Sequence, residues 1–150
     1  MDKGIYCLLF RNPSCTVMVG ALGPVAFRAG WHIYVGSALG SGGLARLRRH
    51  IALSRSRDRR PQWHVDYLSM NPCFCLRSTV HALTDERLEC RFAAALGGAA
   101  VPRFGASDCD CTSHLFYRGR NPVKEAEAAF RSLGLAPCTT TIMNREHCKG

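Results

Sequence analysis

The chain has 150 residues, of which 47% are hydrophobic and 21% charged, and its formal net charge is +9. This size predicts one domain, and the balance of hydrophobic and charged residues excludes a disordered chain. No apolar run approaches the roughly 20 residues of a membrane-spanning helix, and no export signal stands at the start. We therefore expect a soluble, cytoplasmic protein that keeps its nine cysteines reduced.

Three β-prone segments open the sequence. Residues 4–10 are rich in strand formers and end at Arg11-Asn12-Pro13, which is a turn signal. A second strand is predicted at about residues 16–20, and a third at residues 31–35 after a glycine-marked stretch. Strands this close in sequence predict an antiparallel meander.

A helix is predicted after the glycine-rich segment 36–43. Leu44, Leu47 and Ile51 recur at spacings that place them on one helical stripe. Arg46 and His50 lie four residues apart on a different face, so they can point together at a ligand. The glycine-rich segment lacks the Gly-Lys-Ser/Thr ending of a nucleotide-binding loop, which argues against a nucleotide cofactor.

An arginine-rich stretch coincides with this helix and the loop after it. Seven arginines lie between residues 46 and 60, against a single acidic residue, Asp58. Arginine pairs with phosphate through two parallel hydrogen bonds, so the stretch predicts nucleic acid, and DNA first, as the partner. The alternative is a solvated basic loop. Besides Arg46, the predicted DNA-binding residues are Arg48, Arg49, Arg55, Arg57, Arg59 and Arg60.

The second half of the chain adds more of both element types. Residues 63–68 alternate apolar and polar side chains, which indicates a half-buried strand or, alternatively, a short helix. Residues 73–83 are predicted as a strand and residues 85–96 as a helix that places Glu89 near the border of its buried face. A strand at 114–117 and a helix from Asn121-Pro122 to about residue 133 follow.

These elements predict an α/β (α+β) fold in which a small, mainly antiparallel central sheet is flanked by helices. Residues 1–135 form a single domain in this interpretation, and residues 136–150 form a flexible C-terminal tail.

With these elements in place, the chain resembles the GIY-YIG nuclease superfamily. Gly4-Ile5-Tyr6 matches the first signature tripeptide, and Tyr34-Val35-Gly36 matches the second with valine for isoleucine. The likeness is greatest to a divergent branch of small, mostly uncharacterised domains. That branch has Gly-Ser-Ala-Leu-Gly after the second tripeptide and Ser-Asp-Cys-x-Cys-x-Ser-His near the end, here at residues 36–40 and 107–114. Several motifs in the right order carry more weight than any one alone.

The resemblance implies a metal-dependent endonuclease that hydrolyses DNA phosphodiester bonds, in DNA repair or processing. Glu89 would hold one divalent cation, Mg²⁺ or Mn²⁺, and Arg46 would bind a phosphate oxygen and stabilise charge in the transition state. Tyr6 or Tyr34 would position or deprotonate the attacking water. The family's asparagine is missing near Pro102-Arg103-Phe104-Gly105, where Ser107 and Asp108 are the nearby substitutes.

The choice of base stays open at this point. A free tyrosine has a pKa of about 10, so the cation or Arg46 would have to lower the pKa of Tyr6 for it to act near neutrality. His50 titrates nearer to neutral pH and is the rival base. For both tyrosines, packing in the core is the structural alternative.

Two further site hypotheses involve cysteine and histidine. Cys109, Cys111 and His114 could bind zinc, with Cys73 or Cys75 as a further ligand, although the Cys-x-Cys spacing is tighter than usual. In a strand, His64 and Asp66 would share one side and could form an orienting pair. The rival functions are accordingly a nucleic-acid-binding module without catalysis and a zinc-stabilised interaction domain.

Overall fold

The computed structural model describes residues 2–105 and 113–142. Its centre is a five-stranded antiparallel sheet with strand order β6-β4-β1-β5-β7. The strands of this sheet are β1 (Gly4–Asn12), β4 (Gly30–Ala38), β5 (Cys75–Leu83), β6 (Leu115–Arg118) and β7 (Cys138–Thr141). The predicted fold class, a mainly antiparallel sheet flanked by helices, is confirmed.

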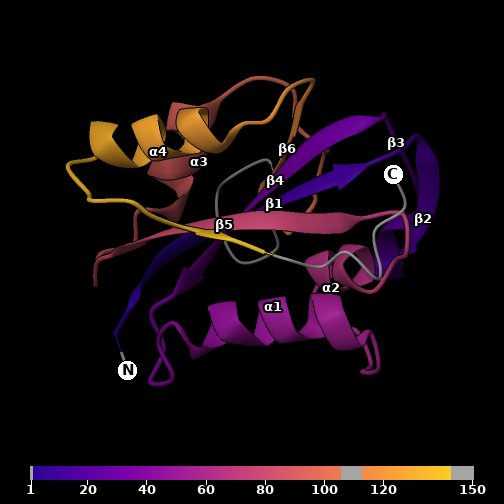
Figure 1. Cartoon of the computed structure of the whole chain (residues 1–150), viewed down its shortest axis with the longest axis horizontal. Coiled ribbons are helices and arrows are strands. Elements are labelled where there is room, and N and C mark those ends of the chain that lie inside the picture. Colours follow the sequence, from indigo (N-terminus) through magenta and orange to yellow (C-terminus); the bar gives the residue numbers. More distant parts are fainter. Residues whose placement is uncertain (1, 106–112, 143–150) are drawn as a thin grey trace.

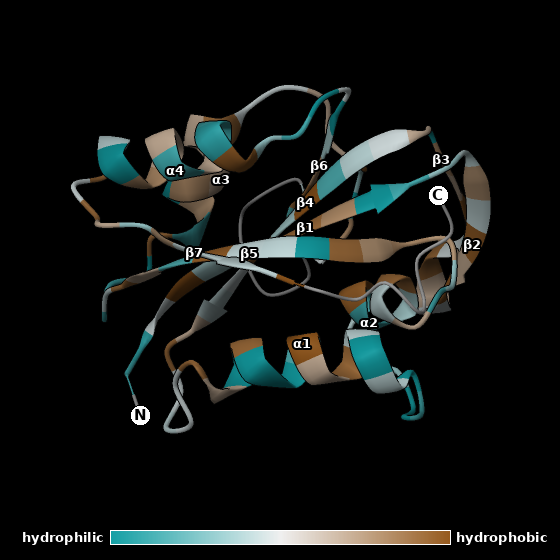
Figure 2. Ribbon diagram, viewed as in Figure 1, coloured by the Kyte–Doolittle hydropathy of each residue, from teal (hydrophilic) through white to brown (hydrophobic). Residues whose placement is uncertain are grey.

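Helices cover both faces of the sheet (Figure 1). On one face lie α1 (Ala45–Ser56) and α2 (His64–Ser69), and on the other lie α3 (Glu89–Leu96) and α4 (Val123–Ser132). The central strand β1 is buried on both sides, because Tyr6, Leu8 and Phe10 pack in the core under α1 and α2. The alternate residues of β1 pack under α3 and α4. The hydrophobic segments accordingly run through the middle of the molecule in Figure 2.

The predicted three-strand meander is wrong in one respect. Strands β2 (Cys15–Val19) and β3 (Gly23–Phe27) pair with each other in a separate two-stranded sheet, joined by the 3-10 turn Gly20–Leu22. Strand β1 already pairs with β4 along one edge and with β5 along the other. No edge of β1 is left for β2, so the hairpin packs beside the sheet instead.

The segment 63–68 forms a helix, not the strand that its alternation indicated. The Asp66 carboxylate accepts hydrogen bonds from the backbone N–H groups of Gln62 and Trp63, at 2.7 and 3.1 Å, and so satisfies donors at the start of α2. Val65, Leu68 and Ser69 then fall on the buried side. The same spacing is compatible with a single helical stripe, which explains the ambiguity in the sequence.

The expectation of a flexible tail from residue 136 onward is wrong for residues 138–141. These four exposed residues form β7, which pairs with β5 from Ser78 to His81. Their sequence is short and polar, and the partner is a free sheet edge almost sixty residues away in sequence, so a local pattern could not reveal it. Over residues 2–105 and 113–142, no helix combines the length and apolar character needed to cross a bilayer.

Candidate active site

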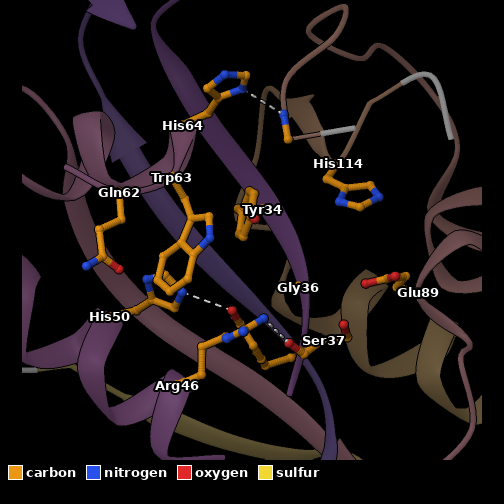
Figure 3. Close-up of a pocket in the computed structure, with 12 residues that line it drawn as sticks. Tyr34, Gly36, Ser37, Arg46, His50, Gln62, Trp63, His64, Glu89 and His114 are labelled. Carbon is orange, nitrogen blue, oxygen red and sulfur yellow. Dashed lines mark hydrogen bonds between the residues drawn. The ribbon is translucent and has the colours of Figure 1, made fainter. Parts of the chain in front are cut away.

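A pocket of about 250 Å³ opens over the face of the sheet that carries α1. All five predicted catalytic residues line it, and they come from β1, β4, α1 and the first residue of α3. Figure 3 shows Arg46 and His50 on one side of the opening and Glu89 on the other. The lining residues are Tyr6, Tyr34, Gly36, Ser37, Arg46, His50, Gln62, Trp63, His64, Glu89, Gly105 and His114.

The two tripeptides Gly4-Ile5-Tyr6 and Tyr34-Val35-Gly36 form one packing unit. They lie on adjacent antiparallel strands in a register that places Tyr6 opposite Gly36. A Cβ atom on Gly36 would lie 2.5 Å from Cζ and 2.6 Å from Oη of Tyr6, so the tyrosine ring occupies the space that any side chain would need. Gly36 is therefore required by the position of Tyr6.

Tyr6, His50 and Asp66 form a buried row of polar groups. Tyr6 and His50 are hydrogen-bonded, whereas the contact between His50 and Asp66 is electrostatic, because Nδ1 of His50 has no hydrogen-bond partner among the described residues. The Tyr6 hydroxyl lies 2.9 Å from Nε2 of His50, and Nδ1 of His50 lies 3.7 Å from Oδ1 of Asp66. Tyr6 and His50 are each 1% exposed and Asp66 is fully buried. Because the carboxylate lies on the Nδ1 side, we assign the ring proton to Nδ1, and Nε2 then accepts a hydrogen bond from the Tyr6 hydroxyl.

Burial sets the protonation of this row. It lowers the pKa of His50 to about 4, although the nearby Asp66 carboxylate acts in the opposite direction. His50 is therefore neutral at pH 7 and able to accept a proton. Burial also raises the pKa of Tyr6 well above its usual value, and this effect outweighs the lowering by Arg46. Arg46 does act to lower the pKa of Tyr6, as expected, but burial raises this pKa by more.

Asp66 is held in place by Arg49. Two guanidinium nitrogens of Arg49 donate to the two carboxylate oxygens at 3.2 and 3.0 Å. Burial by itself would raise the pKa of Asp66, but the hydrogen bonds from Arg49, Gln62 and Trp63 lower it below its usual value. Asp66 is thus an anion, and its negative charge, 3.7 Å from Nδ1 of His50, favours the protonated form of that ring.

Arg46 lies at the mouth of the pocket. Its Nη1 donates to the backbone oxygen of Ser37 at 3.0 Å, and its Cζ lies 5.0 Å from the centre of the Trp63 ring. The residue remains exposed overall. The backbone and ring contacts aim the guanidinium across the pocket mouth, where it is accessible to an anion.

Glu89 lies on the other side of the pocket, and its carboxylate points toward Tyr34 (Figure 3). In the described part of the chain no group of three or more His, Cys, Asp or Glu side chains is arranged to hold a metal ion. A single carboxylate nevertheless fits Mg²⁺, which commonly keeps several waters and binds one or two carboxylates together with substrate phosphate. The donor set is therefore suited to a metal that arrives with its substrate.

The six arginines predicted to contact DNA fall into two groups. Arg48, Arg55, Arg59 and Arg60 are exposed. Arg49 is bound to Asp66, and the half-buried Arg57 ends α1 in a left-handed conformation with φ of 53° while its Nη2 donates to the Phe74 oxygen at 3.4 Å. The exposed group is free to contact a polyanion, whereas Arg49 and Arg57 have contacts within the protein.

The structure does not bring the described zinc candidates together as one site, and the other candidates lie outside the described residues. Cys109 and Cys111, with the possible asparagine substitutes Ser107 and Asp108, are outside the described residues. His114 lines the pocket. Cys73 is a free thiol, but Cys75 and Cys90 each take part in a disulfide, so Cys75 is not available as a ligand and the expectation of fully reduced cysteines is wrong for these two.

Sequence reasoning missed three contributions to the pocket. Trp63 and Gln62 line it, and Asp66 supports His50. His64 and Asp66 do not form the suggested orienting pair, because Nδ1 of His64 accepts a hydrogen bond from the Gly105 N–H at 3.0 Å while Asp66 binds Arg49. The available signal was the helix-capping position of Asp66, three residues after Trp63.

Comparison with known proteins places this antiparallel α+β domain in a family. A model described as a domain of unknown function, DUF123, matches residues 5–135. The chain belongs to this family, and the matched range includes every residue that lines the pocket. No curated protein and no solved structure matches the chain.

Proposed function

We propose that this chain is a metal-dependent endonuclease of the GIY-YIG superfamily that hydrolyses DNA phosphodiester bonds. One observation supports this most strongly: two tyrosines, an arginine, a histidine and a glutamate, spread from residue 6 to residue 89, line one pocket. Hydrolysis of a phosphodiester requires charge neutralisation, an oriented water and a route for protons. The pocket offers a group for each requirement.

In this proposal Arg46 and Glu89 place the substrate. Arg46 would bind a non-bridging phosphate oxygen from one side of the pocket, and Glu89 would hold a hydrated divalent cation on the other. When bound, the cation supplies positive charge to the phosphate oxygens as the negative charge increases. The scissile phosphate would be held between Arg46 and Glu89, which lie on opposite sides of the pocket.

Proton transfer follows the buried row behind Tyr6. The Tyr6 oxygen accepts a proton from the attacking water while its own proton moves to Nε2 of His50, which is neutral at pH 7. Asp66 then stabilises the imidazolium that forms. In this proposal Tyr6 and His50 act together as the base, so the phenol need not ionise in advance.

The low pKa of His50 can be tested directly. The folded protein binds the His50 proton only as the pH falls through about 4, so at pH 5 about nine-tenths of the His50 rings should be neutral, whereas an ordinary histidine would be almost fully protonated. NMR titration of the ring carbon-bound protons, with His50→Gln used to assign the signal, measures this. A His50 signal that titrates near pH 6.5 would contradict the lowering of its pKa by burial, and with it the placement of His50 as a desolvated ring behind Tyr6.

The function is tested with purified protein, supercoiled plasmid and branched DNA in Mg²⁺ or Mn²⁺. We expect strand cleavage that stops on addition of EDTA and is absent from Glu89→Ala prepared in the same way. Cleavage that survives in Glu89→Ala would point to a contaminating nuclease or another site. If neither protein cleaves but both bind DNA with steep salt dependence, the chain is a binding module.

A further inference from the structure

Trp63 is the only exposed Trp, Tyr or Phe within residues 2–105 and 113–142. It retains 36% of its surface exposed although it lines the pocket beside His50 and Arg46. A single exposed indole is ordinary at a protein surface and carries no argument by itself. Its place in the lining of the pocket, beside Arg46, puts it where a bound substrate would cover it.

The indole is held as a rigid platform. The guanidinium carbons of Arg46 and Arg49 lie 5.0 and 4.4 Å from its ring centre, and the His50 ring centre lies 5.8 Å away. All three residues belong to α1, so one helix supplies these contacts to the indole. The Trp63 backbone is fixed as well, because its N–H donates to Asp66 at 3.1 Å.

A flat group attached to a phosphate is the ligand that fits this platform. Arg46 would hold the phosphate and also contacts the Trp63 ring, so a substrate bound at Arg46 has its neighbouring nucleoside within reach of the indole. Nucleobases stack on aromatic side chains, and such stacking is worth about 1–3 kcal/mol per base. The bases of an intact duplex are paired and stacked on one another, which hides their faces.

We propose that Trp63 stacks on an unpaired nucleobase next to the phosphate held by Arg46. The substrate class is then nucleic acid with unpaired nucleotides at the cleavage point, such as a single strand, a flap or a bulge. This inference rests on the proposed function and narrows its substrate.

Fluorescence can report on Trp63 alone. The chain has two tryptophans, and the Trp31→Phe variant leaves Trp63 as the single indole. In EDTA, to prevent cleavage, we expect oligothymidylate to quench the fluorescence of this variant and a blunt duplex of equal length to leave it nearly unchanged. Equal quenching by both nucleic acids, or by neither when both bind, would overturn the inference.

The affinity test separates the base from the backbone. We expect Trp63→Ala to bind oligothymidylate about 5- to 150-fold more weakly than the wild type, the equivalent of 1–3 kcal/mol. An abasic strand of the same length should bind both proteins equally, because it has no base to lose. Trp63→Phe should restore part of the difference, and thermal unfolding checks that the variants are folded.

Two outcomes overturn the inference and leave the proposed function intact. If Trp63→Ala weakens both strands equally, the indole acts only by holding Arg46 and Arg49. If the wild type cleaves DNA but binds the abasic strand as tightly as oligothymidylate, no base is stacked. A wild type that binds none of these nucleic acids would overturn the proposed function together with the inference.

Discussion

Glu89→Gln is expected to lower the single-turnover rate of DNA cleavage by about a thousandfold, because a catalytic metal contributes several kcal/mol and each 1.4 kcal/mol is about tenfold. Glutamine keeps the size of the side chain but lacks the negative charge that binds a hard cation. Glu89 is half-buried at the first turn of α3, so the fold should tolerate the change. Affinity for DNA, measured in EDTA, should stay within a few-fold of the wild type.

A matched control is available just before the same helix. Glu86 is exposed and does not line the pocket, so Glu86→Gln makes the same chemical change outside the site. It should leave both the cleavage rate and its dependence on Mg²⁺ concentration unchanged. Equal rates for the Glu86 and Glu89 variants would show that Glu89 does not hold the metal and would remove the central element of the mechanism.

Much of the fold could be predicted because most elements have a strong local pattern. Strand β1 and helix α4 were found from strand-forming residues and from the Asn121-Pro122 helix start, respectively. Strand β7 was missed because its four exposed residues depend on the free edge of β5, and α2 was ambiguous because a carboxylate cap, rather than periodicity, decides it. A local sequence pattern does not reveal strand pairing over a long sequence distance or the capping of a helix by a side chain.

The candidate site was predictable as a set of residues but not as a set of contacts. The tripeptides and the spacing of Arg46 and His50 indicated which side chains to bring together. The partners of these side chains were not indicated, since the link from His50 to Asp66 joins α1 to α2. Likewise, Arg49 was grouped with the DNA-binding arginines because its ion pair with a buried carboxylate is visible only once the two helices are packed.

Gly36→Ala is expected to reduce cleavage by about 10²-fold, because a misplacement of about 1 Å in a catalytic group can have that effect. The new methyl group would lie 2.6 Å from the Tyr6 hydroxyl, so the ring must shift and the 2.9 Å hydrogen bond to His50 is lost. Overpacking of a core in this way costs about 1–3 kcal/mol in unfolding free energy. Urea unfolding and single-turnover cleavage measure the two effects.

Gly40→Ala provides the control, since a Cβ atom there has no neighbour within 4 Å and stability and activity should be unchanged. A double mutant distinguishes a general loss of stability from an effect through Tyr6. In a Tyr6→Phe background the hydroxyl is already absent, so adding Gly36→Ala should lower cleavage little further. If the two losses instead multiply, the alanine acts elsewhere, and Tyr6 is not the group that Gly36 positions for catalysis.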